Sequence, residues 1–191
     1  MTPEPLSALL VDDDPNQLDS LAILLQTVGL RVVTASCAAE ALDALEHAAP
    51  IDVAVVDLAL GGRDGAEENG IDLARMLKQK RPALEIILLT GAQDADQVKV
   101  LKSGIRTYMV KGRENDDVQL LQIQAAAREG LLNRLTGELL RTTDSEELRQ
   151  RILAFANTLS GAVEASIALP RPDGGVAVSY THLTLPTSDL V

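Results

Sequence analysis

Apolar runs and amphipathic stretches alternate along most of the first 130 residues. Stretches with apolar residues three or four positions apart predict helices over 15–29, 38–47, 71–79 and 94–102. Five short runs rich in valine, leucine and isoleucine predict strands at 7–11, 31–35, 51–57, 84–90 and 106–111. Alternation of this kind is typical of a parallel sheet covered by helices on both faces, so the pattern predicts an α/β domain.

The predicted first helix has signals at both ends. Pro15 suits a first helical position and Gly29 suits the end of a helix. Asp14 directly precedes the helix, where an acceptor side chain is favoured, so we expect it to cap the helix.

From Asp117 the pattern changes, because apolar residues keep helical spacing over a longer stretch than a single domain needs. This predicts a long helix, which either connects two domains as a parallel coiled coil or packs on the sheet. Thr143 and Glu146 have the spacing of a capping box and predict a new helix. Runs at 163–169 and 175–181, joined by "PRPDGG", predict a β-hairpin and a partial α+β second domain.

Composition narrows the function. The 191 residues are 46% hydrophobic and 24% charged, which indicates a globular chain, and the net charge of −11 argues against nucleic acid as a partner. Cys37 has no second cysteine to pair with, and His47 and His182 lack metal-ligand spacing. Without a signal segment or an apolar run of membrane-spanning length, we expect a soluble, cytoplasmic protein with no membrane partner.

Polar residues follow four of the five predicted strands. The first strand is followed by Asp12 and Asp13, the third and fourth end in Asp57 and Thr90, and the fifth ends in Lys111. Ligands of open parallel sheets bind outside the carboxyl ends of the strands, so these side chains should converge. Neighbouring carboxylates repel, and a divalent cation such as Mg²⁺ together with the ammonium group can offset that repulsion. An aspartate in such a site can attack a phosphoryl group.

The motifs "VDDDP", "VVDLAL", "LLTG" and "YMVKG" occur in an order and near a spacing that resemble a response-regulator receiver domain of bacterial two-component signalling, over residues 6 to about 128. The resemblance implies a flavodoxin-like, doubly wound (βα)5 sheet. It implies that Asp57 accepts a phosphoryl group from a phosphohistidine of a sensor histidine kinase or histidine phosphotransferase. It also implies that Asp13, Asp57 and the backbone carbonyl of Ala59 ligate Mg²⁺, with Asp12 acting through water.

The same resemblance implies a conformational switch. Thr90 would move towards the new phosphate, the ring of Tyr108 would turn inward behind it, and Lys111 would pair with a carboxylate or the phosphate. Separately, the long helix predicted from Asp117 suggests that two copies of the chain form a homodimer through this helix.

The chain departs from the family at two prolines. Gly112 follows the lysine, and Gly61 stands four residues after the proposed acceptor, where the family usually has proline. The loop after the third strand also carries extra residues around "GAEEN", either a determinant of partner choice or a tolerated surface insertion.

Three other functions compete with this interpretation. A haloacid-dehalogenase-like phosphatase would use Asp12 as nucleophile and Asp14 as acid, but it leaves Asp57 without a role. A receiver-like interaction module would bind partners without phosphorylation, yet it would have no reason to keep the repelling carboxylates. An FMN-binding flavodoxin would need a hydroxyl-rich first loop and aromatic residues, whereas this chain has an acidic loop and no tryptophan.

The predicted organisation has four parts. Residues 1–128 form the receiver domain, 129–142 a helical linker, and 143–177 the start of a truncated segment that resembles a GAF domain. Residues 178–191 include "VSYTHLTLPT", which resembles a translated sequencing adapter and predicts a non-native tail.

Overall fold

The computed structural model describes residues 5–61, 67–91, 105, 107–112, 115–160, 164–170 and 175–182. The chain separates into two compact units, one from Pro5 to Arg134 and one that contains the chain from Leu135 onward. The sequence pattern placed the end of the first domain at residue 128.

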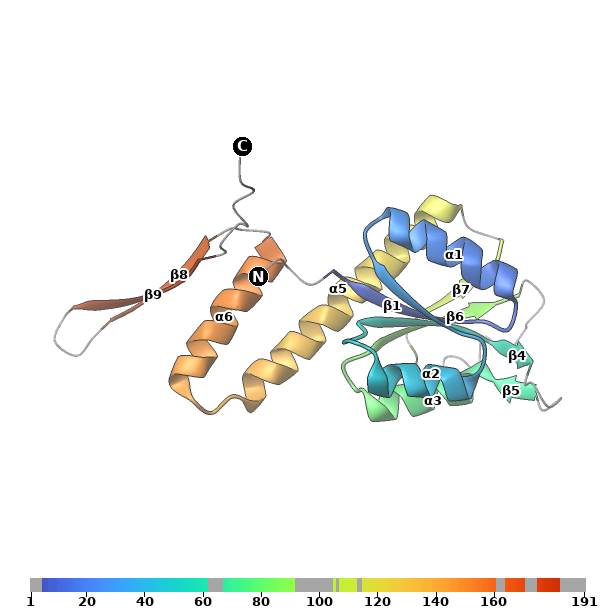
Figure 1. The fold of residues 1–191 in the computed structure, drawn as a ribbon, viewed down its shortest axis with the longest axis horizontal. Helices are drawn as coiled ribbons and strands as arrows, with labels where there is room; N and C mark the ends of the chain where they lie inside the picture. Colours follow the sequence, from blue (N-terminus) through green and yellow to red (C-terminus); the bar gives the residue numbers. More distant parts are fainter. Residues whose placement is uncertain are drawn as a thin grey trace, which may run out of the picture. The chain divides into compact units, whose positions relative to one another are not determined.

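The larger unit is built on a five-stranded parallel sheet with the strand order β2-β1-β3-β6-β7 (Figure 1). The strands are β1 (Ser7–Val11), β2 (Arg31–Ala35), β3 (Val53–Asp57), β6 (Glu85–Thr90) and β7 (Thr107–Val110). All five predicted strands are confirmed. The order reverses between β1 and β3, so the chain is doubly wound as predicted.

Helices cover both faces of this sheet. They are α1 (Pro15–Thr27), α2 (Ala38–His47), α3 (Gly70–Lys80) and α5 (Asp116–Arg141). The core on one face joins the sheet to α1 and α5, and the core on the other joins it to α2 and α3. The predicted helix at 94–102 lies outside the described residues.

Side-chain alternation along the central strands creates these two cores. Leu10 and Val55 belong to the core under α1 and α5, whereas Leu9 and Val56 belong to the core under α2 and α3. All four are at most 1% exposed, because both faces of the strand are covered. This burial explains why the sequences of these strands are continuous apolar runs.

The cap predicted for the first helix is confirmed. The side chain of Asp14 accepts a hydrogen bond of 2.9 Å from the backbone N–H of Asn16, and Pro15 begins α1. The helix ends at Thr27, and Gly29 adopts a positive φ of 85° just beyond it.

The long loop after β3 contains a short hairpin that the sequence did not predict. Strands β4 (Ala59–Gly61) and β5 (Glu67–Asn69) pair in antiparallel register, and residues 62–66 between them lie outside the described part. Asn69 also caps α3, because its side chain accepts a hydrogen bond of 3.0 Å from the N–H of Ile71. Of the extra residues, Glu67–Asn69 therefore form a short strand that pairs with β4 and leads into α3.

Helix α5 packs very closely on the amino-terminal edge of the sheet. A Cβ atom at Gly130 would lie 1.9 Å from the carbonyl oxygen of Asp52, so only glycine permits this approach. The buried carboxylate of Asp52 accepts hydrogen bonds from the backbone and hydroxyl of Ser7, and forms an ion pair of 3.2 Å with Arg134. No local sequence pattern predicts this network, because its members are distant along the chain.

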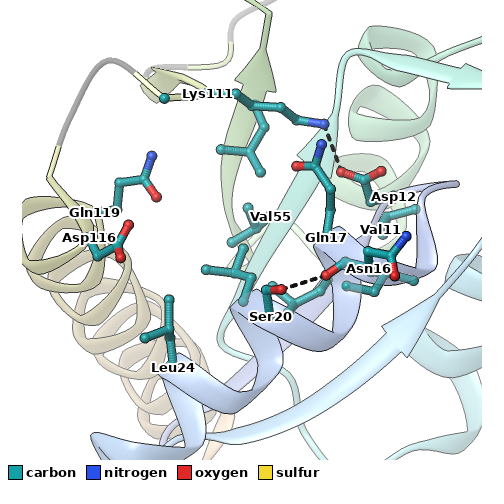
Figure 2. A pocket seen from close by; sticks show the side chains of 15 residues that line it. Val11, Asp12, Asn16, Gln17, Ser20, Leu24, Val55, Lys111, Asp116 and Gln119 are labelled. Carbon is teal, nitrogen blue, oxygen red and sulfur yellow. Dashed lines mark hydrogen bonds and ion pairs between the residues drawn. The ribbon is translucent and has the colours of Figure 1, made fainter.

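Helices α1 and α5 leave a cavity of about 360 Å³ between them (Figure 2). Asn16, Gln17 and Ser20 line it from α1, and Asp116 and Gln119 line it from α5. Its floor is formed by apolar side chains of the sheet and of α1. The cavity therefore opens on the same face as the core that holds α5.

The smaller unit contains α6 (Ser145–Ser160) and the antiparallel pair β8 (Glu164–Pro170) and β9 (Val176–His182). The predicted hairpin is confirmed, although its turn lies outside the described residues. Strand β9 includes residues 178–182 of the predicted non-native tail. The non-native origin of these residues stays a prediction.

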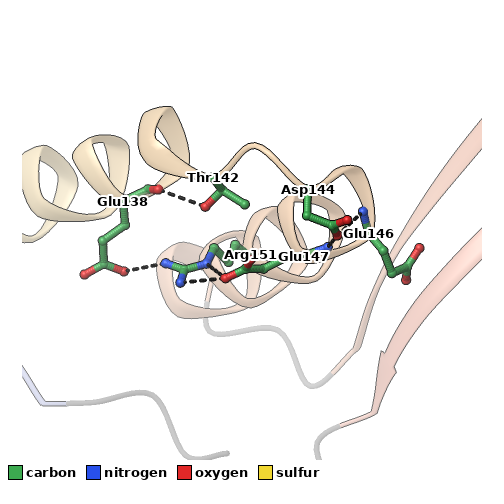
Figure 3. A network of polar contacts seen from close by, with 6 residues as sticks. All are labelled: Glu138, Thr142, Asp144, Glu146, Glu147 and Arg151. Atoms are coloured by element: carbon green, nitrogen blue, oxygen red, sulfur yellow. Dashed lines mark hydrogen bonds and ion pairs between the residues drawn. The ribbon is translucent and has the colours of Figure 1, made fainter.

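The predicted capping box of α6 is wrong. Asp144, rather than Thr143, accepts hydrogen bonds of 2.9 and 2.8 Å from the N–H groups of Glu146 and Glu147 (Figure 3). A carboxylate is as good an N-cap as a hydroxyl, and here the helix starts one residue later than the box requires. Arg151 forms an ion pair with Glu147 within α6 and another with Glu138 of α5, and the second pair joins α6 to the end of α5.

Candidate functional site

Three carboxylates meet at the carboxyl end of the sheet. Asp12 and Asp13 follow β1 directly, and Asp57 is the last residue of β3, the strand next to β1. One oxygen atom from each lies within 4.8 Å of the others. Asp12 and Asp57 are 5% and 6% exposed, whereas Asp13 is exposed. The predicted convergence of the three aspartates is confirmed.

Lys111 lies opposite two of these carboxylates. Its Nζ atom is 2.8 Å from Oδ2 of Asp12 and 3.0 Å from Oδ1 of Asp57. The lysine follows β7, and its backbone N–H donates a hydrogen bond of 2.8 Å to the carbonyl oxygen of Thr90. One ammonium group therefore offsets two buried negative charges.

Charge and burial act on the acidity of the site. Burial raises the pKa of Asp57 above its ordinary value of 3.8; the hydrogen bond and charge of Lys111 act in the opposite direction, and the charge of Asp12 adds to the rise. Burial lowers the pKa of Lys111, but its bonds to Asp12 and Asp57 outweigh burial and leave that pKa raised. Lys111 is thus a stable cation, and its hydrogen bond and charge compensate only part of the effect that burial has on Asp57.

The remaining predicted residues lie around this cluster. Thr90 ends β6, is 6% exposed, and donates its hydroxyl to the carbonyl of Gly91 at 3.3 Å. Tyr108 lies on β7 and is exposed, at 36%. Ala59 begins β4 two residues after Asp57, and the ligand role of its carbonyl stays a prediction.

The donor set fits a magnesium ion. Carboxylate oxygens are hard ligands that Mg²⁺ prefers, and it binds through one or two of them while keeping several waters. The exposed carboxylate of Asp13 leaves the cluster open to water and to a phosphoryl group. The three aspartates therefore satisfy the chemistry that the ion requires.

The β4–β5 hairpin contributes a contact that sequence reasoning missed. A Cβ atom at Gly61 would lie 2.7 Å from Oδ2 of Asp13. The glycine that replaces the family's usual proline therefore leaves room for a carboxylate of the acid cluster. The departure from the family motif was the only sequence signal for this contact.

Asp14 has a role that argues against the phosphatase alternative. Its Oδ1 atom accepts hydrogen bonds from the backbone and side-chain amides of Asn16 at 2.9 and 3.2 Å. Asp12 is bound to Lys111 and to the backbone N–H of Asp14. A carboxylate engaged in helix capping is poorly placed to act as the general acid of that chemistry.

The model of the response regulator receiver domain family matches residues 8–122. The chain therefore belongs to this family, and the region is a receiver domain of two-component response regulators. The match ends within α5, and the predicted GAF-like character of residues 143–177 gains no support from the comparisons.

Individual relatives agree with this assignment. The chain is 38% identical over 113 residues to the photosynthetic apparatus regulatory protein RegA of Cereibacter sphaeroides, covering 59% of this chain and 58% of RegA. It is 33% identical over 157 residues to the transcriptional regulatory protein KdpE of Mycobacterium tuberculosis, covering 80% of this chain and 61% of KdpE. The chain thus spans less than two thirds of the length of these relatives.

Solved structures show the same fold. A CheY-like receiver domain protein from Methanospirillum hungatei is similar with a TM-score of 0.58 and 27% identity, covering 66% of this chain and 97% of that one. The chain also resembles a structure described as an adenylate cyclase from Rhodopirellula baltica, with a TM-score of 0.62 and 26% identity, covering 73% and 99%. Within the described residues, no helix is long and apolar enough to span a membrane.

Proposed function

We propose that Asp57 is the phosphoryl acceptor of this receiver domain. The observation that carries the proposal is the position of its carboxylate, buried at the end of β3, 3.0 Å from Lys111 Nζ and beside Asp12 and Asp13. Asp13 is exposed and Asp14 caps α1, so neither has this combination of burial and a cationic partner.

The donor is a phosphohistidine on a sensor histidine kinase or histidine phosphotransferase. An oxygen of Asp57 forms a bond to phosphorus, the bond from phosphorus to the imidazole nitrogen breaks, and its electron pair stays on the nitrogen. Catalysis of such a transfer is mostly positioning and charge stabilisation. Lys111 supplies a fixed positive charge at the acceptor oxygen.

Asp12, Asp13 and Asp57, with the backbone carbonyl of Ala59, would hold the magnesium ion. When bound, the ion neutralises charge on the transferring phosphoryl oxygens. The ligand set rests on the close approach of the three carboxylates. Asp12 is engaged with Lys111 and the N–H of Asp14, which supports its contact with the ion through water.

Thr90 and Tyr108 carry the response to phosphorylation. The hydroxyl of Thr90 lies at the end of the strand next to β3 and binds only weakly, at 3.3 Å, so it is available to donate to a phosphoryl oxygen. Tyr108 is exposed and lies on the neighbouring strand β7. Movement of Thr90 towards the phosphate would let the tyrosine ring turn inward.

Intact-mass measurement with acetyl phosphate tests the assignment. The chain should gain one phosphoryl group in the presence of Mg²⁺, and Asp57→Asn should gain none. If Asp12→Asn abolishes a covalent intermediate that Asp57→Asn retains, the phosphatase alternative is correct. If the wild-type chain gains no phosphate at all, it is a phosphorylation-independent interaction module.

The outer face of α5 supports a homodimer as a further partner. Val118, Ala125 and Leu132 follow one another at seven-residue intervals, and Leu121 lies between the first two. All four are exposed, with Leu121 at 65%. Such spacing is that of a two-stranded coiled coil of identical helices. Leu121→Glu should shift a dimer to monomer in analytical ultracentrifugation, whereas Gln122→Glu should leave it unchanged.

The order of elements in the smaller unit supports the proposal that it begins a second, sensory domain. Helix α6 followed by the β8–β9 hairpin has the element order with which a GAF domain opens. Its test is the structure of a longer native reading frame, in which the two strands should join a larger antiparallel sheet.

A further inference from the structure

The cavity between α1 and α5 has an apolar floor. The side chains that form it are Leu10, Val11, Leu18, Leu21, Leu24, Val55 and Leu89. Its volume of about 360 Å³ lies within the range of small-molecule sites. Gly112 borders the cavity with a φ of 72°, and a Cβ atom there would have nothing within 4 Å. The residue after Lys111 therefore places no side chain at this end of the cavity.

Polar groups surround the mouth of this cavity. Asn16 and Ser20 direct side-chain hydrogen bonds to neighbours in α1 and its cap. Gln17, Asp116 and Gln119 make no recorded side-chain hydrogen bond or ion pair to the described part of the chain (Figure 2). Amide and carboxylate groups from two helices are thus available to a ligand lying between them.

The charge at the mouth selects the type of ligand. Among the described residues that line the cavity, Lys111 is the only cation, and it is already shared by Asp12 and Asp57. Asp116 is exposed and has no cationic partner within the described residues. A ligand with a positive group would complement Asp116, whereas an anion would meet two carboxylates.

We propose that this cavity is a binding site for a small organic amine. The apolar body of the ligand lies on the leucine floor, and its ammonium group faces Asp116. Gln17 and Gln119 offer hydrogen-bond donors and acceptors to any polar substituent. The site is distinct from the acid cluster, but Asp12 and Lys111 border both.

Titration with tryptamine tests the binding. The chain contains no tryptophan, so indole emission reports the probe alone, and its anisotropy measures the bound fraction. The titration uses the full chain without Mg²⁺ or phosphodonor, so its result does not depend on the proposed phosphorylation. We expect saturable binding of tryptamine, weaker binding of the neutral analogue tryptophol, and no binding of indole-3-acetate.

Variants locate the site. Leu24→Phe adds bulk to the floor and should abolish binding. Asp116→Asn should weaken binding about five-fold, the upper range for an exposed ion pair. Asp117→Asn removes an equal negative charge from the same turn of α5. Asp117 does not line the cavity, so this variant should bind tryptamine as the wild type does.

Several outcomes would overturn the proposal. They are non-saturable binding, equal binding of indole-3-acetate, or equal losses in Asp116→Asn and Asp117→Asn. Circular dichroism of Leu24→Phe distinguishes a filled cavity from an unfolded chain, and if that variant unfolds, the aspartate pair decides alone.

Occupancy of the cavity should also affect the acid cluster, a consequence that rests on the proposed function. A bound amine adds a positive charge to a cavity that Asp12 and Lys111 also line, next to the carboxylates that Lys111 pairs with. Saturating tryptamine should then change the rate of phosphoryl uptake from acetyl phosphate at least about two-fold in the wild type and not in Leu24→Phe. Equal rates with and without tryptamine would disprove this coupling while the anisotropy result stands.

Discussion

Gly61 and Asp13 are in such close contact that a Cβ atom on the glycine would lie 2.7 Å from Oδ2 of the aspartate. The contact involves the far end of a flexible side chain, which can rotate away in the metal-free chain. A carboxylate that holds a metal ion cannot rotate freely. A side chain at position 61 should therefore cost metal affinity rather than stability.

We predict that Gly61→Ala weakens Mg²⁺ binding about ten-fold, which corresponds to about 1.4 kcal/mol. Isothermal titration calorimetry measures this affinity. The free energy of unfolding in EDTA should change by less than about 0.5 kcal/mol, since the free carboxylate relaxes. Unchanged Mg²⁺ affinity would show that Asp13 binds the ion in another rotamer.

A second prediction compares two glycines of α5. Gly130→Ala should destabilise the larger unit by about 3 kcal/mol, because its Cβ would meet the backbone oxygen of Asp52, which also accepts a hydrogen bond from the N–H of Glu85. Gly137→Ala has nothing within 4 Å of its Cβ and should stabilise the helix by up to about 1 kcal/mol. Urea unfolding measures both. Equal effects would mean that α5 does not pack closely at Gly130.

The third prediction concerns pH. Because burial raises the folded-state pKa of Asp57 above 3.8, the folded metal-free chain binds the proton more tightly than the unfolded chain does. The resulting stability is complete below pH 3.8 and is lost as the pH rises through the raised pKa. Asp57→Asn should therefore be more stable than the wild type at neutral pH in EDTA.

That difference should shrink as the pH falls towards 3.8, where the wild-type carboxyl is protonated. Urea unfolding of both chains across this range measures it. A variant that is less stable than the wild type at neutral pH would show that the pairing with Lys111 outweighs the burial of Asp57.

The fourth prediction concerns the lifetime of the phosphoryl group. Ala59 lies two residues after Asp57 and is exposed at the start of β4, and its methyl group cannot orient a water molecule. Ala59→Asn should accelerate dephosphorylation several-fold by positioning the attacking water. Decay of the phosphorylated chain at saturating Mg²⁺ measures the rate.

The control for this prediction is a chain with the β4–β5 extension shortened. If only that variant changes the rate, the extension sets water access and Ala59 has no part in it. A second alanine in the corresponding position after Thr90, Ala92, lies outside the described residues.

The sequence by itself determined the parallel sheet and the meeting of its polar residues. Buried strands such as β1 and β3 are continuous apolar runs because both of their faces are covered, and this pattern is local. Once the strands are parallel, their carboxyl ends share one edge, so Asp12, Asp57 and Lys111 had to lie near one another. Asp14 was equally predictable, because helix capping involves neighbours in the chain.

Only the tertiary structure decided which distant groups touch. The ion pair of Asp52 with Arg134 spans 82 positions and has no local pattern. The approach of Gly61 to Asp13 depends on a hairpin whose short strands carry no strong β pattern. The cavity beside α5 depends on how two helices pack over one sheet. Local propensity reflects the chain within a few residues, whereas these features depend on side-chain volume and distance in three dimensions.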